Sequence, residues 1–342
     1  MTPDGPPTLT DGVVTLRAWR DDDVDEAIAG HDEEIRFWFG FPQVTPTRQQ
    51  QERAIADWRR DYADGRKRVS FVVEAIGRQA GTVEVRDVGG STGELSWALY
   101  AGQRSRGYAS RAMRLLVKYA FAPAPEGLGL GRLQARVHPE NSRSIRLARR
   151  SGLRNEGQSR AAPGSGGHDH ILLARLVDDP DPGDRAGFRA LLNSFLPRKR
   201  VIAQALVRDP DGRVLMCHPT YKDDWDLPGG VVEELESPHT AVGREITEEL
   251  GLVLPIMALV LTDWLPPWGG WDDALCLVFD AGVHEARLLD GVVLQAREIR
   301  EARFLTRAQI RERSADYTAR RVEAALAALE HGPAFTESGR PT

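Results

Sequence analysis

The sequence predicts an α+β protein built from two domains of different fold. The chain has 342 residues, which is too long for a single hydrophobic core of ordinary size. An acidic segment rich in proline divides it at residues 178–184. On either side, strand-like and helix-like patterns alternate, and no repeat relates the two halves. We therefore expect domains over residues 9–177 and 201–332, with a linker and connecting helix over 178–200.

Composition restricts the class of protein and its partners. Hydrophobic residues make up 41% of the chain and charged residues 28%, as in soluble globular proteins, and no apolar run approaches the ~20 residues that span a bilayer. Residues 1–12 lack the basic and apolar parts of a signal peptide. Cys217 and Cys276 form no CxxC or Cys/His cluster, so we expect a reducing cytoplasm without a disulfide or zinc site. A net charge of -5 argues against general nucleic-acid binding, which leaves small molecules as the expected substrates.

The segment between the domains has two parts. Residues 178–184 contain two prolines, one glycine and four aspartates, which continue neither a strand nor a helix interior. Apolar residues then recur at helical spacing up to Pro197, at Phe188, Leu191, Leu192, Phe195 and Leu196. This spacing predicts a short amphipathic helix that leads into the second domain.

In the first domain, alternating apolar residues predict strands and longer amphipathic segments predict helices. Acids at residues 21–23 are typical of a helix start, and Gly77 and Gly89-Gly90 mark turns. We expect strands at residues 13–19, 70–76, 82–88, 94–100, 133–137 and 170–177. We expect helices at residues 48–62, 107–121 and 142–150. Their order predicts a mixed central sheet with helices.

The second domain begins with an expected hairpin. Its strands cover residues 201–208 and 214–218, and the turn Asp209-Pro210-Asp211-Gly212 has residues that favour tight turns. Further on we expect helices at residues 237–250 and 306–329 and strands at residues 258–264 and 274–279.

Three carboxylates share one face of the helix expected at residues 237–250. Glu245, Glu248 and Glu249 stand at positions i, i+3 and i+4, which are neighbours on a helix surface. Like charges placed in this way repel each other and destabilise the helix unless a partner neutralises them. Mg²⁺ prefers carboxylate and phosphate oxygens together, so these residues are candidate metal ligands. The alternative is a solvated acidic face, which is the usual interpretation of such a run.

The residues around this helix complete a longer motif. Gly230 is followed after five residues by Glu236, and after seven more by Arg244-Glu245-Ile246-Thr247-Glu248-Glu249-Leu250-Gly251-Leu252. This pattern resembles the Nudix box, G-x5-E-x7-R-E-U-x-E-E-x-G-U, with every specified position filled. The resemblance implies an α/β/α sandwich and a hydrolase that uses Mg²⁺ or Mn²⁺ to cleave a nucleoside diphosphate linked to another moiety. The metal ligands that it implies are the Gly230 carbonyl, Glu245, Glu248 and Glu249.

The resemblance also implies catalytic roles. Arg244 would pair with Glu236 or Glu245 and fix the orientation of a carboxylate. Glu245 is the first candidate for the base that removes a proton from water, and Glu298 or Glu301 is the alternative.

An aromatic, proline-rich loop follows the motif and bears on the substrate. Its members are Trp264, Pro266, Pro267, Trp268 and Trp271. Aromatic rings of this kind stack on a base or ribose, and a proline near this position resembles Nudix proteins that cleave ADP-ribose. We therefore favour an ADP-ribose-like substrate. A rigid loop that covers the core is the alternative interpretation.

A glycine-containing turn in the first domain has the features of a phosphate-binding loop. Residues 103–110 read Gln-Arg-Ser-Arg-Gly-Tyr-Ala-Ser and lie between an expected strand and an expected helix. Backbone amides at a helix N-terminus bind phosphates, and the helix dipole adds to the attraction. Gly107 allows a phosphate to approach the backbone closely, and Arg104 or Arg106 adds positive charge. An ordinary capped turn is the alternative.

A second segment of the first domain supports the same interpretation. Residues 137–144 read Val-His-Pro-Glu-Asn-Ser-Arg-Ser and are followed by Ser151-Gly152-Leu153. Together with the turn, they resemble GNAT acetyltransferases, and among these the group that acetylates ribosomal-protein N-termini. The resemblance implies a GNAT fold, with acetyl-CoA as cosubstrate and Asn141 both capping a helix and contacting the pantetheine arm. The residues expected to bind the pyrophosphate are Arg104, Ser105, Arg106, Gly107, Tyr108, Ala109 and Ser110.

Acetyl transfer to an amine also requires a base and an acid for the departing thiolate. By resemblance Glu94 is the candidate base, and an exposed acid at a strand end is the alternative. Ala148 stands where many GNAT proteins carry a tyrosine acid. His168 and His170 are candidates to face the acceptor, or are ordinary surface residues.

We interpret the chain as a bifunctional enzyme, a Nudix hydrolase and an N-acetyltransferase whose acceptor is an amine or a peptide N-terminus. The alternative is a Nudix hydrolase with a non-catalytic GNAT domain that serves as a CoA- or ligand-binding regulatory module. A third hypothesis is that both sites act on one nucleotide-linked amine. We expect no membrane partner, and the sequence does not predict the oligomeric state.

Overall fold

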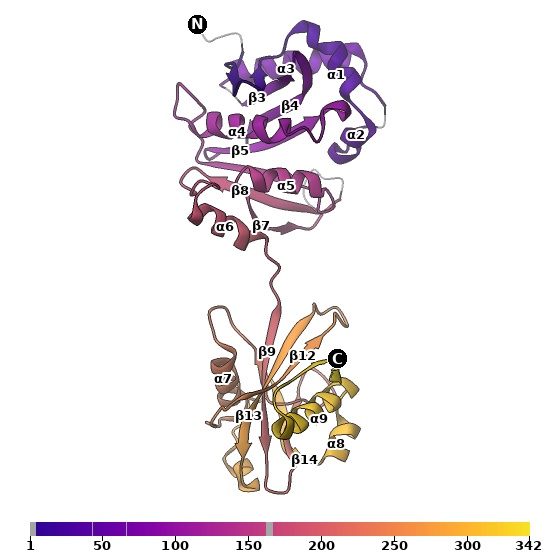
Figure 1. Ribbon diagram of the computed structural model, residues 1–342, viewed down its shortest axis with the longest axis vertical. Coiled ribbons are helices and arrows are strands. Elements are labelled where there is room, and N and C mark those ends of the chain that lie inside the picture. Colours follow the sequence, from indigo (N-terminus) through magenta and orange to yellow (C-terminus); the bar gives the residue numbers. More distant parts are fainter. Residues whose placement is uncertain (1–4, 43, 66, 162–166) are drawn as a thin grey trace. The chain divides into compact units, whose positions relative to one another are not determined.

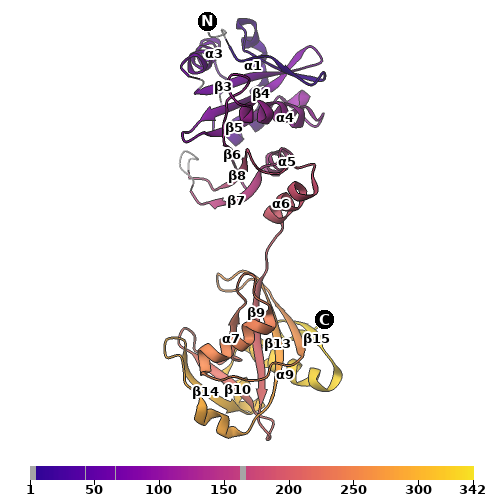
Figure 2. The same ribbon diagram turned by 90° about the vertical axis from the view of Figure 1, so that its left-hand side faces the viewer.

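The computed structural model describes residues 5–42, 44–65, 67–161 and 167–342. The chain divides into two compact units, Met1–Leu196 and Pro197–Thr342, whose elements are shown in Figures 1 and 2. Helix α6 (Arg185–Phe195), from the segment expected to connect the domains, packs in the first unit against β7 (Arg154–Ser159). There the Ser194 hydroxyl accepts a hydrogen bond from the Asn155 amide at 3.2 Å.

One mixed sheet forms the centre of the first unit. In the described residues its strand order is β1-β2-β3-β4-β5-β6-β8-β7, and only β5 and β6 pair in parallel. The other strands are β1 (Leu9–Thr10), β2 (Val14–Arg17), β3 (Arg68–Ala75), β4 (Arg78–Asp87), β5 (Thr92–Leu99), β6 (Arg132–Val137) and β8 (His170–Leu176). The other helices are α1 (Val24–Gly30), α2 (Glu33–Phe39), α3 (Arg48–Ala63), α4 (Tyr108–Phe121) and α5 (Ser142–Arg150).

Helices cover both faces of this sheet because alternate residues of a strand point to opposite sides. Phe71 and Val73 of β3 join the core cluster that contains Met113 of α4. Val72, between them in sequence, joins a smaller cluster with Ile55 of α3. The helices α3 and α4 therefore pack on opposite faces of the sheet.

The two parallel strands separate near the middle of the sheet. β5 and β6 pair at three positions, from Thr92↔Arg132 to Glu94↔Gln134. β5 then continues to Leu99, while β6 pairs with β8 along its other edge. Beyond the paired positions β5 meets α5, where the Trp97 indole donates a hydrogen bond to the Ser144 hydroxyl at 3.2 Å. This separation opens the sheet beside the loop that precedes α4.

The second unit is a three-layer sandwich with a sheet between helices. In the described residues its strand order is β14-β10-β9-β13-β12-β15-β16, and β11 also pairs with β9. Ala203 of β9 packs with Ile246 of α7 on one face, whereas Leu206 packs with Val322 of α9 on the other. The strands are β9 (Arg200–Arg208), β10 (Val214–Pro219), β11 (Gly229–Val231), β12 (Leu259–Leu265), β13 (Ala274–Val283), β14 (Ile299–Leu305), β15 (Ala334–Glu337) and β16 (Arg340–Pro341). The helices are α7 (Pro238–Leu250), α8 (Arg307–Arg313) and α9 (Asp316–His331).

The single helix expected at residues 306–329 is wrong, because the structure has two helices there. α8 ends at Arg313, since Ser314 adopts an extended backbone with φ -109° and ψ 157°. The Arg313 carbonyl accepts a hydrogen bond from the Trp225 amide at 3.0 Å. This bond ties α8 to the chain that leads into Gly229.

The hairpin expected from residues 201–208 and 214–218 forms only in part. β9 and β10 pair at Val214↔Arg208, and β10 then pairs along its length with β14. β9 pairs instead with β11 and β13, which places it in the middle of the sheet.

Candidate active sites

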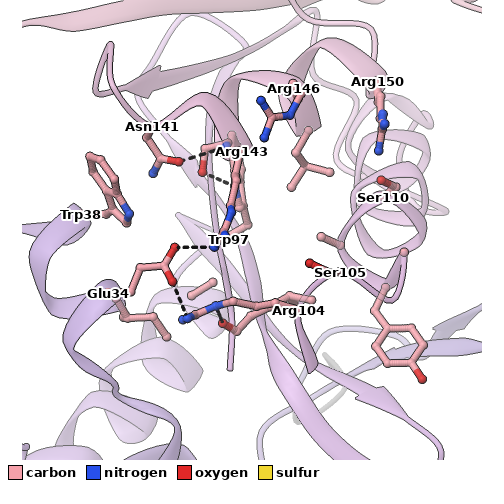
Figure 3. Close-up of a pocket in the computed structure, with 18 of the residues that line it drawn as sticks. Glu34, Trp38, Trp97, Arg104, Ser105, Ser110, Asn141, Arg143, Arg146 and Arg150 are labelled. Carbon is pink, nitrogen blue, oxygen red and sulfur yellow. Dashed lines mark hydrogen bonds and ion pairs between the residues drawn. The ribbon is translucent and has the colours of Figure 1, made fainter. Parts of the chain in front are cut away.

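A cavity of about 340 Å³ lies beside the end of β5 (Figure 3). Its walls are α2, the end of β5, the loop before α4, and α5. The predicted cofactor-binding residues that line it are Arg104, Ser105, Gly107, Tyr108, Ala109, Ser110 and Asn141. Arg106 does not line it. The structure therefore brings most of the predicted set around one cavity.

The loop before α4 has a backbone shape that requires glycine. Gly107 immediately precedes α4 with a φ of 81°, a left-handed conformation that strains residues with a Cβ atom. The first amides of a helix have no partner within it, and the helix dipole attracts anions to them. Since this helix N-terminus lines the cavity, the geometry suits a phosphate group.

Arg104 lines the cavity, but its guanidinium is bound to protein groups. It donates to Glu34 at 2.7 Å, to Asp32 at 2.7 Å and to the Leu99 carbonyl at 2.8 Å. Figure 3 shows Glu34 between Arg104 and Arg143, which also donates to this carboxylate at 3.3 Å. Burial acts to raise the pKa of Asp32, but the hydrogen bond from Arg104 holds that pKa below its ordinary value. The positive charge of Arg104 is thus matched by two carboxylates.

Asn141 and Ser144 begin α5 at the edge of the cavity. The Asn141 side-chain oxygen accepts a hydrogen bond from the Ser144 amide at 3.1 Å, so Asn141 caps the helix. The Ser144 hydroxyl also lines the cavity and accepts from the Trp97 indole. Its own proton can therefore be donated to a ligand.

Glu94, the candidate base, lies outside the lining of the cavity. Its carboxylate pairs with Arg86 at 2.5 Å and with Arg136 at 3.4 Å, and it accepts from Gln134 at 3.4 Å. The side chain is only 12% exposed. These contacts place it in a structural ion-pair cluster at the start of β5.

Of the two candidate histidines, His168 precedes β8 and His170 begins it. The His138 ring stands 5.5 Å from the Trp38 ring and 5.6 Å from the His168 ring. Trp38 lines the cavity, so the rings of Trp38, His138 and His168 form a row that leads away from the cavity. Burial, together with the nearby charge of His138, lowers the pKa of His170.

In the second unit, Glu245 lies against the backbone of Gly230. A Cβ atom at residue 230 would stand 2.5 Å from the Glu245 carboxyl carbon, so glycine is needed for this approach. Glu249 is buried, and its carboxylate accepts a hydrogen bond from the Gly229 amide at 2.9 Å. Strand β11 and helix α7 thus meet through two of the predicted metal-ligating carboxylates.

Arg244 forms hydrogen bonds with three carboxylates of this site. It donates to Glu236 through two nitrogens, at 2.9 and 3.0 Å, to Glu245 at 3.0 Å and to Glu248 at 2.9 Å. The expected pairing with Glu236 or Glu245 therefore includes both, and Glu248 as well. These bonds, that to Glu236 first, raise the pKa of Arg244.

The charges of this site favour a cation. Burial, with Glu245 and Glu298 nearby, raises the pKa of Glu249 to about 8, and burial also raises the pKa of Glu245. Carboxylate oxygens crowded in this way fit a hard divalent ion such as Mg²⁺. In the part of the chain that the structure describes, no three His, Cys, Asp or Glu side chains already converge as a metal centre. Arg244 and Gly229 hold the carboxylates instead.

Comparison with protein families identifies both domains. Residues 14–154 match the model of the acetyltransferase (GNAT) domain, and residues 198–326 match that of the NUDIX domain. The chain joins a GNAT acetyltransferase domain to a NUDIX domain. The predicted families and the predicted α+β, two-domain fold class are therefore confirmed. The two domains support an enzyme, with hydrolase and acetyltransferase activity in general.

Two curated proteins match short segments of the chain. It is 45% identical over 51 residues to a MutT-like protein of Streptomyces ambofaciens, covering 15% of this chain and 32% of that protein. It is 45% identical over 47 residues to an RNA pyrophosphohydrolase of Halorhodospira halophila, covering 14% and 26%. The chain thus spans about a third or less of the length of these relatives.

Solved acetyltransferase structures align with about half of the chain. The GNAT-family acetyltransferase from Bacillus anthracis is 22% identical and covers 50% of this chain and 99% of its own, with a TM-score of 0.43. RimJ of Mycobacterium smegmatis in complex with CoA-disulfide is 20% identical and covers 56% and 97%, with a TM-score of 0.45. The ribosomal L7/L12 alpha-N-protein acetyltransferase RimL in complex with coenzyme A is 16% identical and covers 50% and 99%, with a TM-score of 0.46.

The two alternative bases of the NUDIX domain differ in their surroundings. The charge of Glu298 contributes to the raised pKa of both Glu245 and Glu249. Glu301 lies on β14 and forms an ion pair with Arg303. Of these two, Glu298 is the acid that interacts with the carboxylate site.

The aromatic loop of the NUDIX domain presents two rings to solvent. Trp268 is 64% exposed and Trp271 is 60% exposed, and their backbones pair with each other. The Trp271 ring lies under the Arg200 guanidinium at 4.9 Å, and the Trp268 ring contacts Tyr317 at 6.0 Å. Rings this exposed do not cover a core, which argues against that interpretation of the loop.

Sequence reasoning missed the α2 wall and the arginines of α5. Glu34 and Trp38 line the cavity from a helix that was not predicted. Arg146 and Arg150 line it from α5. Their spacing of four residues on an expected helix was the available signal.

None of the described helices is long and apolar enough to cross a membrane.

Proposed function

We propose that the NUDIX domain uses Mg²⁺ or Mn²⁺ to hydrolyse a nucleoside diphosphate linked to another moiety. The observation that carries this proposal is the approach of the Glu245 carboxylate to Gly230 beside the buried Glu249. Buried carboxylates that lie close together repel each other, and a bound divalent cation relieves that repulsion. The Nudix-box resemblance and the family match support the same chemistry.

The residues that would hold the metal are Glu245, Glu249 and the Gly230 carbonyl, with Glu248 at the exposed edge. A bound divalent ion neutralises the diphosphate and activates water for attack on phosphorus. Arg244 keeps Glu245 and Glu248 in place through charge-assisted hydrogen bonds. Glu245 is our first candidate for the group that takes the proton from water, and Glu298 is the alternative because of its electrostatic contact with the site.

We assign an ADP-ribose-like substrate to this domain. The exposed rings of Trp268 and Trp271 offer faces on which an adenine base stacks. The loop that carries them joins β12 to β13. Both β11 and β13 pair with residues 202–204 of β9. The register of this sheet therefore supports placing a base-binding loop near Gly230.

The hydrolase is tested with a substrate panel. ADP-ribose, NADH, dinucleoside polyphosphates, nucleotide sugars, nucleoside triphosphates and 5′-triphosphorylated RNA are incubated with the full chain and Mg²⁺, then again with EDTA. We expect turnover of ADP-ribose or a related diphosphate that EDTA abolishes and added Mg²⁺ restores. Turnover of dGTP without turnover of ADP-ribose would overturn the substrate assignment, and no turnover at all would overturn the hydrolase.

We also propose that the GNAT domain transfers an acetyl group from acetyl-CoA to an amine or a peptide N-terminus. The amides that begin α4 bind the pyrophosphate, and Asn141 contacts the pantetheine arm. The Ser144 hydroxyl is the donor available to protonate the departing thiolate, because it lines the cavity and already accepts from Trp97.

Both cysteines are free and buried, which supports our placement of the enzyme in the cytoplasm.

A non-catalytic GNAT domain is the second candidate. The observation that favours it is the position of Glu94, whose carboxylate is held by Arg86 and Arg136 outside the cavity. The two candidates are separated by measuring CoA binding and acetylation of a panel of amines and peptides together. Binding with acetylation supports the transferase, whereas binding without turnover of any acceptor supports a CoA- or ligand-binding regulatory module.

A further inference from the structure

We propose that Arg146 and Arg150 of α5 bind the 3′-phosphate of coenzyme A and make the GNAT domain prefer CoA to dephospho-CoA. This inference rests on the proposed use of acyl-CoA and names the part of the donor that the two side chains recognise. In the phosphate loop, Arg104 is paired with two carboxylates and Arg106 does not line the cavity.

The arginine expected to bind phosphate is already neutralised. Arg104 donates to Asp32 and Glu34, each at 2.7 Å, and Arg106 does not line the cavity. An anion that competed for Arg104 would have to break two ion pairs that are only partly exposed. The loop therefore offers backbone amides and the α4 dipole, which suit the pyrophosphate.

The arginines of α5 are available. Arg146 and Arg150 stand at positions i and i+4, so they share a face of the helix, and both line the cavity. Figure 3 shows them on the α5 side, with Arg150 near Ser110 of α4. Within the described residues, neither guanidinium has an ion-pair partner, whereas the neighbouring Arg143 pairs with Glu34.

The length of α5 matches the layout of the donor. With a rise of ~1.5 Å per residue, Arg146 and Arg150 lie about 7 and 13 Å along the helix from Asn141. If Asn141 contacts pantetheine, both arginines stand toward the nucleotide end of the molecule. A phosphate monoester carries about -1.5 to -2 charges at neutral pH and accepts bidentate hydrogen bonds from guanidinium groups.

Arg149 provides a matched control. It lies on the same helix, but its guanidinium stands over the Phe195 ring at 5.6 Å and it does not line the cavity. Removing it changes the net charge of α5 by the same amount as removing Arg150, and leaves the cavity unchanged.

The test is calorimetric titration of CoA and of dephospho-CoA into the full chain, its Arg146→Ala/Arg150→Ala variant, its Arg150→Ala variant and the Arg149→Ala variant, which removes the same charge as Arg150→Ala. We expect the wild type and Arg149→Ala to bind CoA about tenfold more tightly than dephospho-CoA, and the double variant to bind both alike. Raising the salt concentration should reduce the preference. Equal binding of the two ligands by the wild type, or an unchanged preference in the double variant, would overturn the inference. Binding of neither ligand by the wild type would instead refute the proposed use of acyl-CoA, and the inference with it.

Discussion

Replacing Gly230 by alanine tests how the position of Glu245 affects catalysis, with little effect on the stability of the NUDIX domain. A Cβ atom there would stand 2.5 Å from the Glu245 carboxyl carbon. Atoms in ordinary contact are ~3.5 Å apart, so the carboxylate must retreat by roughly 1 Å. It does so easily, because it is the end of a flexible side chain. The backbone of Gly230 accepts alanine, since its φ is not positive.

A displacement of this size affects catalysis far more than folding. A shift of ~1 Å in a reacting or positioning group costs on the order of 100-fold in rate, and we expect this loss in kcat/KM for Gly230→Ala. Alanine reduces the freedom of the unfolded chain by ~0.4–1 kcal/mol, which offsets a weakened contact between Glu245 and Arg244. We therefore expect the Tm to change by no more than about 3 °C.

Gly243→Ala is the matched control, since Gly243 lies on the same helix α7 as Glu245. Its added Cβ atom would meet nothing closer than 3.9 Å, from Ile256. Alanine in a helix interior stabilises by ~1 kcal/mol relative to glycine, so this variant should melt higher and keep wild-type kcat/KM. The assay pairs chromatographic product release with scanning calorimetry. A folded Gly230→Ala variant whose kcat/KM stays within about threefold of wild type would refute the reasoning.

Three further results are expected, for the metal, the substrate and pH. Mg²⁺ at ~100 times its Kd should stabilise the NUDIX domain by ~2.7 kcal/mol and raise its Tm, with EDTA reversing the change; a Tm that ignores Mg²⁺ contradicts the metal site. Trp268→Ala or Trp271→Ala should raise KM for ADP-ribose by roughly 5- to 150-fold at constant kcat, because stacking contributes ~1–3 kcal/mol; an unchanged KM removes the loop from substrate binding. The hydrogen bond from the Val14 amide, then the ion pair with Arg111, lowers the pKa of Asp11 from 3.8 to about 2. Because the pKa of Asp11 is lower in the folded state than in the unfolded state, its charged form stabilises the fold above the unfolded-state pKa, and this stability is lost as the pH falls toward 2. Asp11→Asn should therefore lose less stability than the wild type over that range in denaturant titrations; equal losses would contradict this.

The helix that carries the carboxylates is predictable because its signals are local. Ser237 caps its start by accepting a hydrogen bond from the Thr240 amide, and Gly251 ends it in a left-handed conformation. Spacing then places Glu245, Glu248 and Glu249 on neighbouring positions of the helix surface without any knowledge of the tertiary structure. What spacing does not give is the contact between Glu245 and Gly230, which depends on how β11 packs against α7.

The partners of Arg104 show where sequence reasoning ends. Its position in the phosphate loop indicates a free positive charge, but Glu34 and Asp32 lie 70 and 72 residues away in the chain. Glu34 belongs to α2 and Asp32 caps its start, and the side chains of so short a helix alone do not distinguish it from a loop. Charge pairing at that sequence separation is decided by the fold. The break between α8 and α9 has a similar origin, because the carbonyl of Arg313 bonds to the distant Trp225 amide.

The most direct test of the central claim compares two variants, each of which removes the charge of one carboxylate. Glu245→Gln and Glu312→Gln each replace one carboxylate by an amide, the first beside Gly230 and the second on exposed α8. With the substrate that the panel identifies and saturating Mg²⁺, Glu245→Gln should lose on the order of 100-fold or more in kcat/KM, while Glu312→Gln retains wild-type activity. Equal activity in the two variants would contradict the assignment of this carboxylate site as the hydrolytic centre.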